Sequence, residues 1–367
     1  MAPYNRSNRR MIEGIPSLVW GGIGEEVIAD DLIADDLTFI PTLRICLAHI
    51  GEEFSKVYLA GTSCAAFYIG WRADSLWSGM GGSVYAFPED REPGLENLFK
   101  AIGRDFTVIK KSEPERLWEA AVLSINAGRP VVCVEWDPIP HRGHYAILTG
   151  YDQEKREFLG RSYTHKPLKE YVSLRPENLH YILVIGEKSK EKTSSYEAAL
   201  GALRCAAQMS KMGIKIGEEE GACGLVAYER QAQMIPEGMD PKQNRYGLLE
   251  HFLFWRLEVL YQCRRYAIHY LKEIASEFPT FSRECLKAAE EYKKLIKIFD
   301  KHIRIIFPPE SNEEKTSLLW REDNKEHPIR ELFSTAKGRR QFAGLLLKMR
   351  DLEQKAIDEV EKTVEKY

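Results

Sequence analysis

Cys64 is the residue in this sequence whose type and surroundings best fit a nucleophile. It follows Gly61, Thr62 and Ser63 and precedes small and apolar residues, a pattern that predicts a tight loop feeding the first turn of a buried helix. The backbone N–H groups and the positive end of the helix dipole stabilise a thiolate at such a position, so the cysteine can react near neutral pH. The alternative is that Cys64 is a small buried core residue, as cysteines outside disulfides usually are.

A thiolate nucleophile needs a base, and His144 is the histidine best placed to supply it. His144 opens the predicted strand 144–151 directly after a loop containing Pro and Gly, at the end of a sheet where side chains face a cleft. A cysteine at a helix start and, 80 residues later, a histidine at a strand start have the order and element types of papain-like enzymes.

The third member of a catalytic triad has no obvious candidate with an acidic side chain. In a hairpin centred near Glu154, His144 lies diagonal to Ser162, and no carboxylate or amide falls at that place even if the register slips by one residue. A hydroxyl can fix the tautomer of the imidazole but stabilises an imidazolium less than a carboxylate does, so the acid could instead come from Asp137 or Glu135. Asp152 lies ~26 Å further along the strand and belongs to the turn.

The residues expected to bind the substrate follow or adjoin Cys64 in the sequence. They are Ser63, Trp71, Trp77 and Tyr85. A cluster of glycines at 79–82 lacks the spacing of a phosphate-binding loop and is interpreted as a mobile segment near the pocket, or as a bend. A cleft filled by these aromatic side chains would favour a binding role over catalysis.

Composition and charge exclude several classes of protein. The chain has 367 residues, a net charge of −3 and 44% hydrophobic residues, typical of a globular protein long enough for two domains. Lys and Arg do not gather as a phosphate-binding surface requires, so we expect no nucleic acid partner. No segment approaches the ~20 apolar residues of a membrane span and no signal peptide is recognisable, so we expect a cytoplasmic protein without membrane association.

We expect neither a metal nor a cofactor. The seven cysteines are odd in number and lack Cys-x-x-Cys spacing, which indicates neither a disulfide framework nor a zinc site. The tetrapeptide Ile-Ala-Asp-Asp occurs twice, at 28–31 and 33–36, and each copy contains two adjacent acidic residues. The pattern is more typical of a solvated helix face than of a cation site. Cys46 lies on the apolar face of a predicted helix and is expected to be a core residue.

Hydrophobic periodicity divides the chain into a mixed part and a helical part. Strands are predicted at 83–87, 106–109, 131–136, 144–151, 157–164 and 180–185, with helices at 42–50, 94–102 and 113–127. Beyond residue 193, helices alone are predicted, at 194–212, 221–235, 246–276, 281–306 and 338–366. We therefore predict an α+β protein: a segment 1–40 packing on a first domain, 41–190, with a mostly antiparallel sheet, followed by an all-α helical bundle domain, 194–367.

Four segments resemble, in the same order, the N-terminal domain of the butirosin-biosynthesis-protein-H-like family. They are Gly-Thr-Ser-Cys-Ala-Ala-Phe at 61–67, Asn-Leu-Phe-Lys-Ala-Ile-Gly at 97–103, Gly-Arg-Pro-Val-Val at 128–132 and His-Tyr-Ala-Ile-Leu-Thr-Gly-Tyr-Asp at 144–152. That domain is similar to the bacteriocin-processing papain-like peptidases. The resemblance covers about residues 40–190, and a helical domain like 194–367 accompanies some members. It implies a papain-like fold with Cys64 as nucleophile and His144 as base, used for acyl transfer or amide cleavage.

The sequence also departs from this family. Arg161-Ser162 stand where relatives have an Asp, often followed by Pro, and some members place their cysteine near the position of Cys46. Relatives with glycine at the position of Cys64 indicate that part of the group is not catalytic. The departures leave Cys46 as an alternative nucleophile and assign no acidic residue as the third member of the triad.

Two functions from different classes follow. In the first, Cys64 attacks the thioester, ester or amide carbonyl of a small-molecule or peptide substrate, or of a carrier-bound acyl group, while His144 moves the proton. In the second, a degenerate papain-like fold binds a ligand or a partner protein through the same cleft. The predicted helix 246–276 is rich in apolar residues, which fits a bundle core, a homo-oligomer through the helical domain, or a contact with the first domain.

Overall fold

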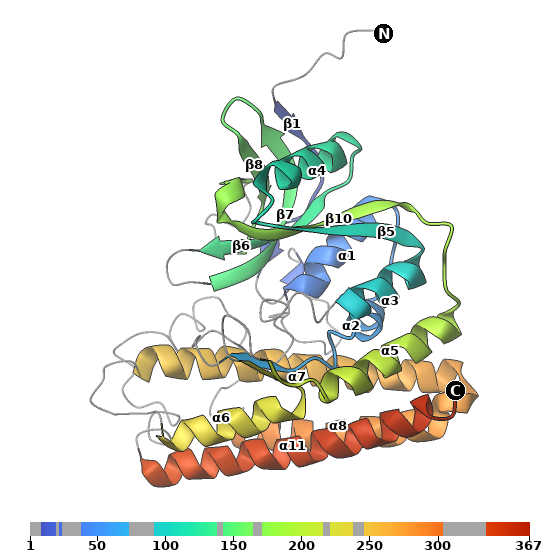
Figure 1. The fold of residues 1–367 in the computed structure, drawn as a ribbon, viewed down its shortest axis with the longest axis vertical. Helices are drawn as coiled ribbons and strands as arrows, with labels where there is room; N and C mark the ends of the chain where they lie inside the picture. The colour runs from blue at the N-terminus through green and yellow to red at the C-terminus, as the bar shows by residue number, and fades with distance from the viewer. Residues whose placement is uncertain are drawn as a thin grey trace. The chain divides into compact units, whose positions relative to one another are not determined.

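The structure is a computed structural model. It describes residues 9–19, 22–23, 38–72, 92–137, 142–163, 171–215, 221–237, 246–303 and 335–367. Within these ranges the chain combines helices with antiparallel sheets (Figure 1), which confirms the α+β class. The chain divides into two compact units, one made of Met1–Lys56 and Phe99–Thr193 and the other of Val57–Leu98 and Ser194–Tyr367.

The first unit is built on a sheet that has seven strands in the described part of the chain. Along the sheet the order is β5-β10-β6-β7-β8-β9, and β1 pairs with the last three residues of β7, Gly150 to Asp152. The strands are β1 (Arg9–Met11), β5 (Arg104–Lys110), β6 (Val131–Asp137), β7 (Arg142–Asp152), β8 (Glu157–Arg161), β9 (Val172–Leu174) and β10 (Leu179–Lys188). A small hairpin, β2 (Leu18–Val19) and β3 (Gly22–Ile23), lies apart from it. The apolar residues 131–134 of β6 and 145–148 of β7 are buried, because helices pack against these strands.

The β7–β8 hairpin has the register that the sequence predicts at the end nearer His144. Ile147 lies opposite Arg161 and Leu148 opposite Gly160, as in a hairpin centred near residue 154. A bulge between Leu148 and Gly150 shifts the pairing by one residue toward the turn. Asp152 accepts a hydrogen bond from the backbone N–H of Lys155 (3.1 Å), which confirms that it belongs to the turn.

Two helices cover the sheet of the first unit, α1 (Phe39–His49) on one face and α4 (Pro114–Asn126) on the other (Figure 1). On α1, every residue from Phe39 to Leu47 except Arg44 is buried, which agrees with the predicted apolar face. On α4, the ring of Trp118 packs at a tilt against the ring of Phe158 on β8, with 4.7 Å between the ring centres. A short 3-10 turn, η2 (Pro176–Asn178), leads into β10.

The second unit is mostly helical. Its elements are α2 (Lys56–Thr62), α5 (Ser195–Ser210), α6 (Leu225–Glu237), α7 (Tyr246–Glu277), α8 (Pro279–Ile298), a π-helical turn η3 (Phe299–Ile303) and α11 (Ala336–Val364). Ser194 begins α5 with a capping box closed by Glu197, and Thr335 caps α11 through the backbone N–H of Gly338. The five long helices agree with the five predicted helical segments to within a few residues, except that α6 begins four residues late and α8 ends earlier.

The second unit is not purely helical, and it is not continuous in sequence. Three short strands, β4 (Gly70–Arg72), β11 (Gly213–Lys215) and β12 (Gly221–Cys223), form a sheet in which β12 is central. The all-α expectation is therefore wrong for this unit. Val57–Leu98 also belongs to it, although we expected this segment in the first domain, and α3 (Glu92–Ile102) carries the chain back to the first unit.

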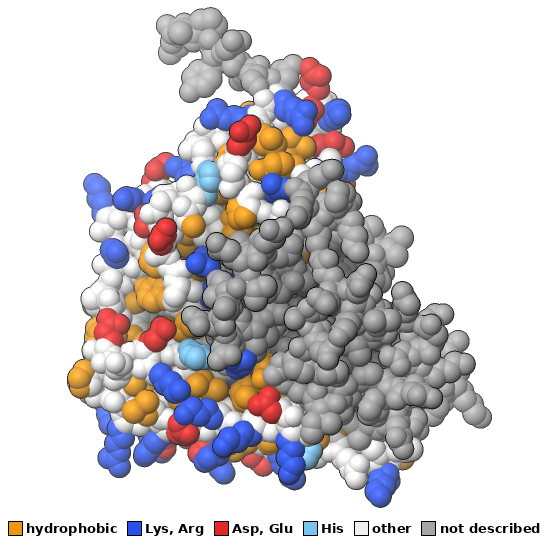
Figure 2. Space-filling model, turned by 180° about the vertical axis from the view of Figure 1, so that it is seen from behind, with side chains coloured by type: hydrophobic (Ala, Val, Ile, Leu, Met, Phe, Trp, Pro, Cys, Tyr) orange, Lys and Arg blue, Asp and Glu red, His pale blue; other side chains and the backbone are white. Residues whose placement is uncertain are grey.

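Two observations concern the surface. Among the helices that the structure describes, none is long and apolar enough to cross a membrane. Figure 2 shows one face of the molecule, on which basic and acidic side chains of the described residues are interspersed. The predicted strand 83–87 and the glycine cluster 79–82 lie outside the described residues.

Candidate functional site

Cys64 does not begin a helix. It follows the end of α2 by two residues and has φ +60°, in the left-handed region that non-glycine residues rarely adopt. Its backbone N–H donates to the carbonyl of Gly61 (2.9 Å), and its own carbonyl accepts from the N–H groups of Phe67 (3.0 Å) and Tyr68 (3.1 Å). The predicted helix start is therefore wrong. The nearest helix end is the C-terminal end of α2, whose partial negative charge disfavours a thiolate.

The thiol of Cys64 is packed inside the second unit. The side chain is 0% exposed, and its Sγ donates to the carbonyl of Ala202 on α5 at 3.4 Å. The neighbouring Ser63 is also buried, and its Oγ donates to the carbonyl of Ala60 (3.4 Å). Gly94 approaches so closely that a Cβ there would lie 2.4 Å from the carbonyl oxygen of Ser63. The turn that carries Cys64 is thus part of a packed interior.

A buried ionic cluster holds the other side of this turn. Arg264 on α7 is 0% exposed. Its Nε donates to Glu353 on α11 (2.7 Å), and its terminal nitrogens donate to the backbone carbonyls of Ala66 (2.7 Å) and Phe67 (3.4 Å). Burial is the largest single influence and disfavours the charged guanidinium, but Glu353 together with the phenols of Tyr292 and Tyr228 raises the pKa of Arg264 above its ordinary value.

Two tyrosines complete the hydrogen bonding of Glu353. Tyr228 on α6 donates to one carboxylate oxygen (3.3 Å) and Tyr292 on α8 to the other (3.0 Å). Burial, and then the charge of Glu353, raise the pKa of both phenols well above the ordinary value, so both hydroxyls keep their protons and act as donors. Four helices therefore meet at one carboxylate.

His144 lies in the first unit, on β7, and its backbone is paired directly opposite Glu135 on β6. Residues directly opposite each other in an antiparallel pair are nearest neighbours on one face of a sheet. Glu135, one of the two acids considered as a substitute for the missing third member, is therefore the cross-strand partner of His144. Cys64 and His144 belong to different units, so their pairing stays a prediction.

The helix start that adjoins β7 within the first unit carries Thr38. Thr38 precedes α1 as its N-cap residue and is buried. Its Oγ1 accepts a hydrogen bond from the backbone N–H of Tyr145 (3.3 Å), the residue that follows His144. The ring of Phe39, the first residue of α1, lies 5.0 Å from the ring of Tyr145. A hydroxyl at a helix start next to the His144 strand is the arrangement predicted for the thiol of Cys64.

Ser162 follows β8 and is buried. The neighbouring Arg161 places its guanidinium 3.7 Å from the ring centre of Tyr171, and its Nε donates to the carbonyl of Ile15 (3.1 Å). This Arg161 ties the N-terminal segment to the sheet.

The remaining predicted residues contribute less. Cys46 is buried in α1, and burial raises the pKa of its thiol far above the ordinary value, which disfavours it as an alternative nucleophile. The backbone of Trp71 lies in β4, paired with Ala222 of β12. Trp77 and Tyr85 lie outside the described residues. Among the described residues no cluster of His, Cys, Asp and Glu has the arrangement of a metal site.

No known family model and no curated protein matches this chain.

Sequence reasoning missed Thr38 and Arg264. Thr38 precedes an apolar run and has the residue type of an N-cap, so the start of α1 could have drawn attention to it. Arg264 sits between Gln262 and Tyr266 in a long helical pattern, and nothing in the sequence distinguishes it from a solvent-facing arginine. Its role depends on contacts with segments about 90 and 200 residues away.

Proposed function

We propose that this chain is a catalytically inactive relative of the papain-like enzymes, which uses the helix-and-sheet frame of its first unit to bind a small molecule or a peptide without cleaving it. The observation that carries the proposal is the hydroxyl of Thr38 at the start of α1, next to the strand of His144. In the papain-like arrangement a cysteine begins the helix that meets the strand of the catalytic histidine.

The chemistry of Thr38 supports binding over catalysis. A threonine hydroxyl is a weak nucleophile unless a base removes its proton, and its oxygen here already accepts the N–H of Tyr145. A hydroxyl remains a good hydrogen-bond donor to a ligand.

The surroundings of the Cys64 thiol also support a binding role without catalysis. A thiol that is 0% exposed, near the C-terminal end of a helix and hydrogen-bonded to a carbonyl lacks the electropositive, accessible surroundings of reactive cysteines.

Hydrolysis assays test this proposal directly. The purified chain is incubated with p-nitrophenyl acetate and with the acetyl thioester of N-acetylcysteamine, beside the Cys64→Ser and His144→Ala variants. We expect all three proteins to release product at the same rate as buffer alone. Turnover by the unaltered chain that is lost in Cys64→Ser would overturn the proposal.

A restored thiol tests the geometry behind it. In Thr38→Cys the new thiol would lie at a helix N-terminus beside the His144 strand, where a cysteine pKa falls from about 8.5 to about 6.5. At pH 6.5 the thiolate fraction then rises about 50-fold, and the lower nucleophilicity of the more acidic thiol reduces the gain in alkylation by iodoacetamide to about fivefold. Thr42→Cys, one turn further along α1, is the matched control.

We expect the Thr38→Cys gain to disappear in the double variant Thr38→Cys/His144→Ala. A Thr38→Cys thiol no more reactive than that of Thr42→Cys would show that α1 and β7 do not form a papain-like pair.

A second candidate function is acyl transfer by Cys64 itself, and one observation favours it. Non-glycine residues held at positive φ cluster at active sites, and Cys64 has φ +60°. Labelling of Cys64 by iodoacetamide at pH 6–7 in the folded chain would favour this candidate over the inactive one.

A further inference from the structure

We propose that Arg264 and Glu353 form a latch that keeps the turn Ser63–Tyr68 closed, and that the latch couples the accessibility of the Cys64 thiol to the seating of helix α11. Arg264 is the connecting residue, since it donates to two carbonyls of the turn and to a carboxylate of α11. The inference goes beyond the proposed function and does not depend on it, because all the residues involved lie in the second unit.

The first argument is that the turn needs outside support. Cys64 has a left-handed backbone, which is unfavourable for an L-residue with a side chain and persists only when surrounding contacts impose it. Contacts on one side come from α3 and α5: Asn97 donates to the carbonyls of Thr62 (2.9 Å) and Ala198 (3.1 Å), and Cys64 donates to Ala202. On the other side, Arg264 donates to Ala66 and Phe67.

The second argument is that stability alone does not explain a buried ion pair. Replacing such a pair with apolar residues of similar size is often neutral or stabilising, whereas removing one partner leaves an uncompensated charge. Arg264 does something that an apolar residue cannot do, because it donates hydrogen bonds to backbone carbonyls of a segment about 200 residues away in sequence. The pair therefore specifies the conformation of the turn.

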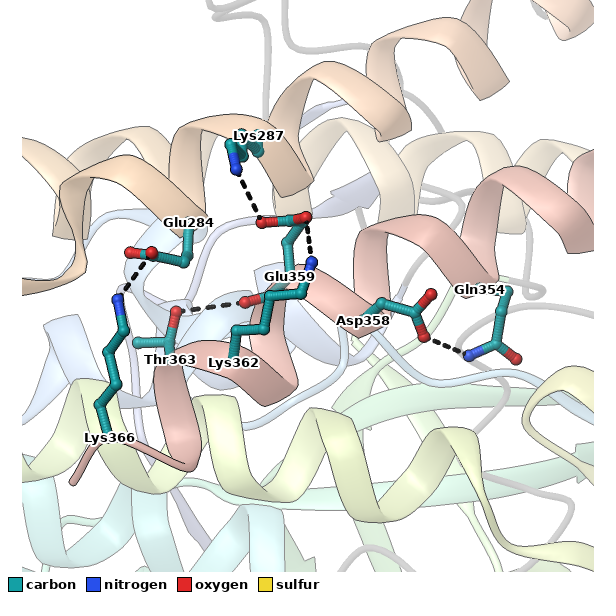
Figure 3. A network of polar contacts seen from close by, with 8 residues as sticks. All are labelled: Glu284, Lys287, Gln354, Asp358, Glu359, Lys362, Thr363 and Lys366. Carbon is teal, nitrogen blue, oxygen red and sulfur yellow. Dashed lines mark hydrogen bonds and ion pairs between the residues drawn. The ribbon is translucent and has the colours of Figure 1, made fainter.

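The third argument concerns α11, the helix that supplies Glu353. Beyond Glu353, the last turns of α11 are tied to α8 by ion pairs at the surface, which include Lys287–Glu359 and Lys366–Glu284 (Figure 3). In both pairs the lysine is about half exposed (50% and 48%), whereas the carboxylate is mostly buried (15% and 9% exposed). These pairs seat the end of α11 on α8, and Glu353 on the same helix links the position of α11 to Arg264.

Cysteine labelling measures the state of the latch. The folded chain is exposed to a pulse of iodoacetamide, and the modification of each cysteine is quantified by mass spectrometry. Cys263 on α7 and Cys285 on α8 are buried in the same unit and serve as internal references. In the unaltered chain we expect Cys64 to react as slowly as these two.

Two variants open the latch in different ways. Glu353→Gln leaves Arg264 as an uncompensated buried cation, which must move toward solvent and release the turn. We expect Cys64 to react at least about tenfold faster than in the unaltered chain, equivalent to about 1.4 kcal/mol in the opening equilibrium, with Cys263 and Cys285 unchanged. The variant Arg264→Met/Glu353→Leu/Tyr228→Phe/Tyr292→Phe removes both charges together with the two phenol hydroxyls that donate to Glu353, and it should expose Cys64 to a similar degree.

Glu229→Gln is the matched control, because it removes an exposed ion pair between α6 and Arg350 of α11 without touching the turn. It should leave all three labelling rates unchanged. The latch is refuted if Cys64 stays as slow as in the unaltered chain in both opening variants. It is equally refuted if Cys64, Cys263 and Cys285 accelerate together, since this result would mean that the whole unit has been destabilised.

Discussion

Replacing Gln231 with methionine should make the protein more stable. Gln231 lies on α6, is 2% exposed, and neither its amide nitrogen nor its amide oxygen has a hydrogen-bond partner among the described residues. Its neighbours on the helix, Ala227, Tyr228 and Ala232, are buried as well. An amide that loses its water without gaining a partner opposes folding, so an apolar side chain of similar length suits this position better.

The size of the effect follows from the two atoms involved. At the lower end, each buried donor or acceptor without a partner costs about 1 kcal/mol, so Gln231→Met should gain about 2 kcal/mol. For a unit of about 200 residues, this gain corresponds to a rise in melting temperature of about 4–8 °C. Differential scanning calorimetry measures the melting temperature, and hydrogen exchange of α6 peptides shows whether the gain is local to the helix.

Gln233 provides the control on the same helix, because it is exposed. Gln233→Met should change the stability by no more than about 0.5 kcal/mol. A lower melting temperature for Gln231→Met would refute the reasoning, since it would mean that the amide is hydrogen-bonded in solution. The predicted increase would indicate that Gln231 is kept for a purpose other than stability.

Two further predictions concern the packing of α2 and the end of α11. Gly61→Ala places a Cβ 2.1 Å from the ring of Tyr270, so it should lower the unfolding free energy by about 1–3 kcal/mol. Gly344→Ala is the control: no atom lies within 4 Å of its Cβ, so thermal unfolding should show a neutral or stabilising effect. A hydrogen bond from Lys366 holds the pKa of Glu284 below its ordinary value, so its contribution to stability is present above that value and is lost as the pH falls through the lower, folded-state pKa. The protection factors of the amides in the last turn of α11, which compare measured with intrinsic exchange rates at each pH, should therefore fall in acid. Lys366→Met should remove this dependence, and a variant that keeps it would contradict the assignment.

The elements with a strong local signal were predictable from sequence. The apolar run Val131–Val134 predicted β6, and the charged turn centred near Glu154 predicted the β7–β8 hairpin with the register found at the end nearer His144. Ser194 and Glu197 mark the start of α5 by a capping box that is legible in the sequence. In these cases the residues that determine the structure are neighbours in the chain.

The candidate site was less predictable because its determinants are distant in sequence. The Gly-Thr-Ser-Cys stretch is compatible with the beginning of one helix or the end of another. Only long-range contacts decide between the two: the packing of Gly61 against Tyr270, and the hydrogen bond that Arg264 donates to the carbonyl of Ala66. Pairing of β4 with β12 is likewise a contact between segments about 150 residues apart. Local pattern carries no information on such contacts.

The division of the second unit between two stretches of chain has a consequence for synthesis on the ribosome. Val57–Leu98 is complete early, but Glu353, which accepts from Arg264, follows some 250 residues later. At 5–20 residues per second, the early stretch waits about 10–50 s for its partners. During this interval its apolar residues, Leu59 and Phe67 among them, cannot yet pack against the later helices α7 and α11. Nascent chains of this protein should therefore be substrates for chaperones that shield apolar segments until α11 has been synthesised.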